Sequence, residues 1–169
     1  MSPEDPELSG GKLKILIVHN HYQIPGGEDT VVANEKRLLE QNGHEVIDFG
    51  ASEDNTEIQY YESCVKACEA LQRGEGERAI LLCGTGMGMN VIANRFKGVR
   101  AAVVESVFAA RMCRAINDAN ALCLGAMIWG DWMACEAVDV FLKTKLGDGL
   151  EDLKEFLQQA AKTVEKIDP

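Results

Sequence analysis

A cysteine followed by closely spaced glycines is the part of this sequence best suited to chemistry. The apolar run from Ala79 to Leu82 is long enough for a buried strand, and it leads into Cys83-Gly84-Thr85-Gly86-Met87-Gly88. Apolar residues then recur at helical spacing, so the segment predicts a strand, a tight turn and the start of a helix. Such a turn directs several backbone N–H groups at one point, where the helix dipole also favours negative charge.

Cys83 would lie beside this electropositive turn, which favours the reactive thiolate form of its side chain. A thiolate next to N–H donors suits removal of a proton from the carbon adjacent to a carbonyl, since the donors stabilise the resulting enediolate oxygen. Two plainer interpretations stay open: the cysteine only packs, or the turn binds an anion without catalysis. The glycines alternate, so the segment does not match the Gly-x-Gly-x-x-Gly pattern of dinucleotide-binding turns.

The elements that must position this turn alternate between strands and helices. We expect strands at 13–18, 44–49, 77–83, 99–104 and 121–124, and helices at 30–41, 57–73, from 87, 106–116, 131–143 and 150–167. This alternation predicts an α/β fold, a Rossmann-like three-layer α/β/α arrangement with a five-stranded parallel sheet. Ligands bind such sheets at the carboxyl ends of the strands. His19-Asn20-His21, Cys83 and Glu105 all follow predicted strands, so we expect them at one edge.

Length, charge and cysteine content restrict the kind of protein. The 169 residues predict a single domain over 12–169 after a flexible tail over 1–11. A net charge of -10 without a Lys/Arg-rich run argues against nucleic acid, and no apolar run approaches the roughly 20 residues that span a membrane. The six cysteines form no Cys-x-x-Cys pair, which favours reduced thiols in the cytoplasm. We expect no cofactor and no metal, because His19 and His21 lack a third ligand.

Several pieces of the sequence occur in the order typical of one family. They are Cys83 to Gly88, Ala93-Asn94-Arg95, Gly98-Val99-Arg100-Ala101-Ala102 and Asn117-Asp118-Ala119-Asn120. The series resembles the ribose-5-phosphate isomerase B and galactose-6-phosphate isomerase family over about residues 48–146. The resemblance implies an aldose–ketose isomerase for a sugar or sugar phosphate, in which Cys83 transfers the proton and Thr85 serves the substrate oxygens. It also implies a homodimer whose active site lies at the subunit interface.

The chain departs from this family at positions that bind substrate. Asn20-His21 stands where the family has Asp-His, and an amide can bind a hydroxyl but cannot act as a base. Ile116 replaces the ring-opening histidine, Met127 replaces a phosphate-binding arginine, and residues 147–151 lack the family's basic tail. We expect Glu105 to be a substitute acid or base, or else a simple loop charge. The expected substrate-binding residues are Asn20, His21, Gly84, Gly86, Met87, Gly88 and Asn117.

A second resemblance concerns the beginning of the chain. Residues 14–46 are similar to the first strand and helix of family 4 glycosyltransferases, but 169 residues cannot hold both halves of such an enzyme. The leading hypothesis is therefore an isomerase with an altered substrate range. The alternatives are a non-catalytic or engineered α/β sugar-binding module that has lost turnover and, less favoured because of the length, a glycosyltransferase fragment.

Overall fold

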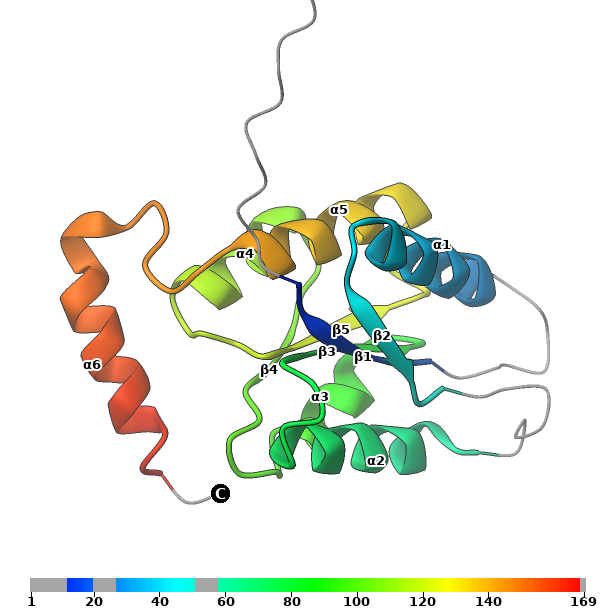
Figure 1. Cartoon of the computed structure of the whole chain (residues 1–169), viewed down its shortest axis with the longest axis horizontal. Helices are drawn as coiled ribbons and strands as arrows, with labels where there is room; N and C mark the ends of the chain where they lie inside the picture. Colours follow the sequence, from blue (N-terminus) through cyan, green and yellow to red (C-terminus); the bar gives the residue numbers. More distant parts are fainter. Residues whose placement is uncertain (1–11, 20–26, 51–57, 168–169) are drawn as a thin grey trace, which may run out of the picture.

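The computed structural model describes residues 12–19, 27–50 and 58–167, which form an α/β fold (Figure 1). The strands are β1 (Lys14–Val18), β2 (Glu45–Asp48), β3 (Arg78–Cys83), β4 (Ala101–Val103) and β5 (Ala121–Gly125). The helices are α1 (Gly27–Gln41), α2 (Tyr60–Gln72), α3 (Met87–Ala93), α4 (Val107–Ala115), α5 (Asp131–Lys143) and α6 (Lys154–Val164), with a 3₁₀ turn at Glu151–Leu153 before α6.

The five strands form one parallel sheet in the order β2-β1-β3-β5-β4, which confirms the predicted fold class. The chain builds β2 on one side of β1 and β3 on the other, so the strand order reverses between β1 and β3. In open parallel sheets the ligand site lies at such a reversal, outside the carboxyl ends of the strands. Cys83 ends β3 at this place.

Alternating side chains along the strands supply two apolar layers. Ile15, Ile80 and Leu122 pack with α1, α4 and α5 on one face, whereas Leu16 and Leu81 pack with α2 and α3 on the other. Figure 1 shows these two helical layers on opposite sides of the sheet. Strands that are buried on both faces must be nearly all apolar, which is why they are recognisable as continuous hydrophobic runs.

Helix α3 is short because Asn94 ends it and turns to the next strand. The Asn94 side-chain amide donates to the Asn90 carbonyl at 3.0 Å and to the Ala101 carbonyl at 2.9 Å, while its oxygen accepts the Ala101 N–H at 3.0 Å. The side chain thus pairs with the first residue of β4 as a neighbouring strand would. These bonds begin β4 at Ala101, two residues later than the sequence predicted.

Helix α6 does not join either layer. The sequence predicted one helix over 150–167, but a 3₁₀ turn precedes α6, and within α6 only Leu157 is buried. Figure 1 shows α6 standing to one side of the sheet and its covering helices. Several large apolar residues therefore stay exposed along this segment: Leu153, Phe156, Val164 and Ile167. No helix in the described ranges is long and apolar enough to cross a membrane.

Candidate active site

Cys83 lies where β3 meets the glycine turn. Its side chain faces the layer of α2 and α3 together with Leu81, and the residue is 5% exposed. The backbone N–H of Gly86 donates to Sγ at 3.2 Å. The turn therefore provides a backbone hydrogen-bond donor to the sulfur of Cys83.

The glycine turn is held against the end of β5. The N–H groups of Ala126 and Met127 donate to the carbonyl groups of Cys83 and Gly84, each at 2.9 Å. A Cβ atom on Gly125 would lie 2.6–2.8 Å from the backbone of Thr85, closer than real Cβ contacts come. The sequence analysis did not select Gly125, and the position of this glycine at the end of a predicted strand was the available signal.

Gly86 has a positive φ of 75°, which side chains rarely adopt. A Cβ atom there would also lie 3.0 Å from the Leu124 carbonyl carbon, so the turn needs glycine for two reasons. Gly88 faces α2, where a Cβ atom would lie 3.0 Å from the ring of Tyr60. Close packing of the turn against β5 and α2 thus accounts for Gly86 and Gly88.

The surroundings of the other thiols differ from those of Cys83. All six cysteines are free. Burial raises the pKa of Cys123 well above its ordinary value and raises that of Cys113 to about 11. The pKa of Cys64 is raised first by its hydrogen bond with Cys68 and then by burial. Cys135 is half-buried on the outer helix α5. Cys83 is therefore the thiol that combines a strand end with the glycine turn.

The other predicted residues of the turn lie together. Thr85 is exposed, Met87 is 50% exposed at the start of α3, and Gly84, Gly86 and Gly88 complete the same segment. The side chain of Met127 is 77% exposed beside this turn, to which its own backbone N–H is bonded. A neutral thioether thus stands at the rim of the turn where the family resemblance leads one to expect a guanidinium group.

Glu105 lies at the same edge of the sheet, but β5 separates its strand from β3. Two strand spacings amount to about 10 Å, so Glu105 does not adjoin Cys83 in the sheet. Asn20 and His21 lie outside the described residues, and their predicted roles stay predictions.

Asn117 lies at the opposite edge of the sheet. It is exposed, and it precedes Asn120, whose carbonyl accepts the N–H of Ala79 near the beginning of β3. Cys83, by contrast, pairs with Gly125 at the carboxyl ends of β3 and β5. One chain therefore does not bring Ile116 and Asn117 to Cys83; the family resemblance predicted a site at the interface of two subunits.

A buried histidine and a carboxylate form a second polar cluster, which the sequence analysis did not recognise. His19 is 6% exposed, and its Nε2 atom lies 3.4 Å from Oδ1 of Asp48, whose other oxygen lies 3.5 Å from Nζ of Lys36. Burial tends to raise the pKa of Asp48, but the hydrogen bonds from His19 and Gly50 and the nearby positive charges outweigh it and lower that pKa. His19 falls on the α1 face of the sheet by strand alternation, opposite the face of Cys83.

The two tryptophans after β5 have different roles. Trp129 is 7% exposed and its Nε1–H donates to the Val104 carbonyl at 2.9 Å, so it packs in the core. Trp132 is 84% exposed on the first turn of α5. Among the described residues, no group of three or more acidic, histidine or cysteine side chains is arranged to hold a metal ion.

Comparison with known proteins identifies the family of this chain. The family model "Ribose/Galactose Isomerase" matches residues 30–165. A 4-deoxy-4-sulfo-D-erythrose isomerase from Clostridium sp. (strain MSTE9) is 43% identical over 134 residues, covering 79% of this chain and 84% of the relative. Ribose-5-phosphate isomerase B of Escherichia coli (strain K12) is 38% identical, covering 66% and 74%. The crystal structure of a Thermotoga maritima ribose 5-phosphate isomerase is 30% identical with a TM-score of 0.76, covering 92% and 99%.

These findings also correct the glycosyltransferase resemblance of residues 14–46. The family match already includes residues 30–46, and β1 and α1 belong to a fold that matches the Thermotoga maritima isomerase over 92% of this chain. The shared feature is a first strand and helix of the Rossmann type, which many α/β proteins contain. The chain therefore belongs to the ribose/galactose isomerase family, and it is an aldose–ketose isomerase.

Proposed function

We propose that Cys83 is the base that moves a proton between the first two carbons of an open-chain sugar. The observation that carries the proposal is the bond from the Gly86 N–H to Sγ at the end of β3. The thiolate takes the proton from C2 of the aldose, and the electrons form an enediolate with negative charge on the C1 oxygen. The thiol then returns the proton to C1, and the proton of the C2 hydroxyl passes to the C1 oxygen, which leaves a ketone at C2 and a hydroxyl group at C1. C2 is oxidised as C1 is reduced, so the step balances without another reactant.

The turn stabilises the enediolate in this proposal. The turn leads directly into α3, which begins at Met87, and the first N–H groups of a helix have no acceptor inside the helix. Preorganised donors of this kind stabilise charge that develops in the transition state. In the same proposal the hydroxyl of Thr85, an exposed residue, binds the substrate oxygens.

For the substrate we propose a four-carbon aldose with a terminal sulfonate. The Clostridium relative, at 43% identity, acts on 4-deoxy-4-sulfo-D-erythrose. A sulfonate carries one negative charge, whereas a phosphate monoester carries about 1.5 to 2 at pH 7. Met127 offers no positive charge at the rim of the turn, which suits the smaller charge. Discrimination in favour of phosphorylated sugars should accordingly be weak.

We further propose that two copies of the chain complete each site. Large apolar side chains are exposed near the carboxyl edge of the sheet and on α3, and such a patch marks a surface that another molecule covers. They belong to Met87, Val91, Phe108, Met127 and Ile128. At the opposite edge, Asn117 and α6 line a groove of about 420 Å³ with apolar walls. If the carboxyl edge of one copy meets this groove of the other, Asn117 of the partner reaches Cys83. The free state of all six thiols supports a cytoplasmic enzyme.

The chemistry is tested by following deuterium exchange in D₂O by proton NMR. With 4-deoxy-4-sulfo-D-erythrose, erythrose 4-phosphate and ribose 5-phosphate as substrates, we expect turnover to be fastest with the sulfonate. Cys83→Ala should remove both turnover and exchange, while Cys113→Ala, which alters a buried thiol outside the turn, should keep both. Binding without turnover for all three sugars would instead favour the non-catalytic module.

The shared site is tested by mixing inactive variants. Cys83→Ala and Asn117→Ala dimers should each be inactive, but each mixed dimer holds one site with both residues intact. Random exchange of subunits should then restore about a quarter of the wild-type activity. A monomeric mass by light scattering, or no recovery after subunit exchange is demonstrated, would refute the shared site and leave the role of Cys83 to the exchange experiment.

A further inference from the structure

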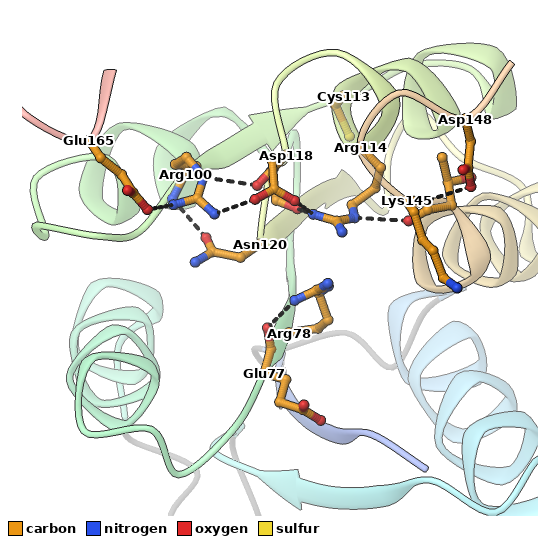
Figure 2. Close-up of polar contacts among 12 residues, drawn as sticks. Glu77, Arg78, Arg100, Cys113, Arg114, Asp118, Asn120, Lys145, Asp148 and Glu165 are labelled. Carbon is orange, nitrogen blue, oxygen red and sulfur yellow. Dashed lines mark hydrogen bonds and ion pairs between the residues drawn. The ribbon is translucent and has the colours of Figure 1, made fainter. Parts of the chain in front are cut away.

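A cluster of arginines lies at the amino edge of the sheet, away from Cys83 (Figure 2). Asp118 is at its centre. Its Oδ1 atom accepts a hydrogen bond from Arg114 Nη1 at 2.6 Å, and its Oδ2 atom accepts one from Arg100 Nη2 at 3.0 Å. Both oxygens of this carboxylate are therefore engaged by two guanidinium groups.

Arg78 brings a third guanidinium group to the cluster. It begins β3 on the same face as Ile80, toward α4, which carries Arg114. Backbone next to Arg78 and the side chain of Arg114 bind adjacent residues. The Ala79 N–H donates to the Asn120 carbonyl, and Arg114 Nη1 donates to the Ala119 carbonyl at 2.7 Å. Figure 2 shows the Arg78 guanidinium pointing toward the Arg114 side of the cluster.

The guanidinium group of Arg78 is only partly hydrogen-bonded. Its Nη1 group donates to the Glu77 carbonyl at 2.7 Å, but its buried Nε has no hydrogen-bond partner in the described part of the chain. Burial lowers the pKa of Arg78 and the charge of Arg114 lowers it further, whereas the charges of Asp118 and Glu77 act in the opposite direction. The Glu77 carboxylate accepts the Lys14 N–H at 3.1 Å. A buried donor without an acceptor is destabilising, so a ligand that supplies an acceptor is favoured.

Arg114 can contribute a donor to the same ligand. The residue is 3% exposed, and it donates through Nε to the Thr144 carbonyl and through Nη1 to Asp118 and Ala119. Its Nη2 group is not used by any of these contacts. On Arg78, the fork formed by Nε and Nη2 matches two oxygens of a tetrahedral oxyanion, and guanidinium groups bind such ions well because they are weakly hydrated.

We propose that Arg78 and Arg114 form a binding site for a small oxyanion, either inorganic phosphate or sulfate or the phosphate or sulfonate end of a metabolite. The bound oxyanion accepts from Nε and Nη2 of Arg78 and from Nη2 of Arg114. The site is distinct from the Cys83 turn, because Arg78 and Cys83 are the first and last residues of β3.

Selenate soaked into crystals of the wild-type protein tests the site directly, because selenium scatters anomalously and no variant is needed. An anomalous peak beside the Arg78 and Arg114 guanidinium groups is expected. Crystals that bind selenate elsewhere but show no peak here would overturn the proposal.

Thermal unfolding in millimolar sulfate or phosphate, compared with sodium chloride of equal ionic strength, tests the site in solution. We expect the wild type to gain thermal stability and Arg78→Gln to lose most of this gain. Arg95→Gln, which removes the same charge from an exposed position on the opposite side of the sheet, should keep the gain. Equal gains in both variants would contradict the proposal. Ethanesulfonate and erythrose 4-phosphate are measured in parallel. A larger gain in thermal stability with these compounds than with sulfate or phosphate would identify the end group of an organic molecule as the ligand.

Discussion

Substitution of Gly125 by alanine should disturb the active site without touching a catalytic group. The added Cβ atom would lie 2.6 Å from the Thr85 carbonyl carbon, and ordinary contact begins at 3.4 Å, so the turn must move by about 0.8 Å. A displacement of about 1 Å in a catalytic arrangement can reduce the rate on the order of 100-fold. The two bonds from Ala126 and Met127 to the turn should weaken as well, at about 0.5–1.5 kcal/mol each.

We therefore expect Gly125→Ala to lower kcat on the order of 100-fold and the free energy of unfolding by about 1–3 kcal/mol. Steady-state kinetics and urea denaturation measure the two effects. Gly130→Ala is the matched control, since a Cβ atom there meets nothing within 4 Å and its φ of -84° suits any residue. Wild-type kcat in Gly125→Ala would refute the claim that this contact sets the geometry of the turn.

Four further outcomes are expected. Asp118→Ala should destabilise the protein by about 3–5 kcal/mol in urea, because it leaves the buried Arg114 unpaired, and Asp118→Asn should cost less because asparagine tolerates the positive φ of 50°. Iodoacetamide at pH 7 should label Cys83 and the half-buried Cys135 before the other thiols, and mass spectrometry should show that substrate protects Cys83 alone. The pKa of Asp48 is lowered from its ordinary value of 3.8, so the charged carboxylate should stabilise the fold above that pH. The difference in free energy of unfolding between wild type and Asp48→Asn should therefore shrink as the pH falls below 3.8. A difference that widens would contradict this. Met127→Arg should raise kcat/KM for erythrose 4-phosphate about tenfold or more relative to the sulfonate, since a charge-assisted hydrogen bond contributes about 1.5–3 kcal/mol.

Local patterns in the sequence were sufficient to predict most of the elements and the glycine turn. The helix expected at 131–143 has these bounds in the structure, because Gly130 precedes a continuous amphipathic segment. The strand and turn around Cys83 were equally clear, since an apolar run followed by alternating glycines has few other conformations. These features depend on the conformational preferences and burial of neighbouring residues, which the sequence states directly.

The positions of the candidate residues Glu105 and Asn117 relative to Cys83 depend on the strand order, which local sequence patterns do not determine. β5 inserts between β3 and β4, which separates Glu105 from Cys83, and the motif that contains Asn117 stabilises the opposite edge through Asp118. The contact between Gly125 and Thr85 likewise joins two segments that are far apart in the chain. Periodicity determines whether a segment is a strand or a helix, but which strands become neighbours is decided by the packing of the whole sheet.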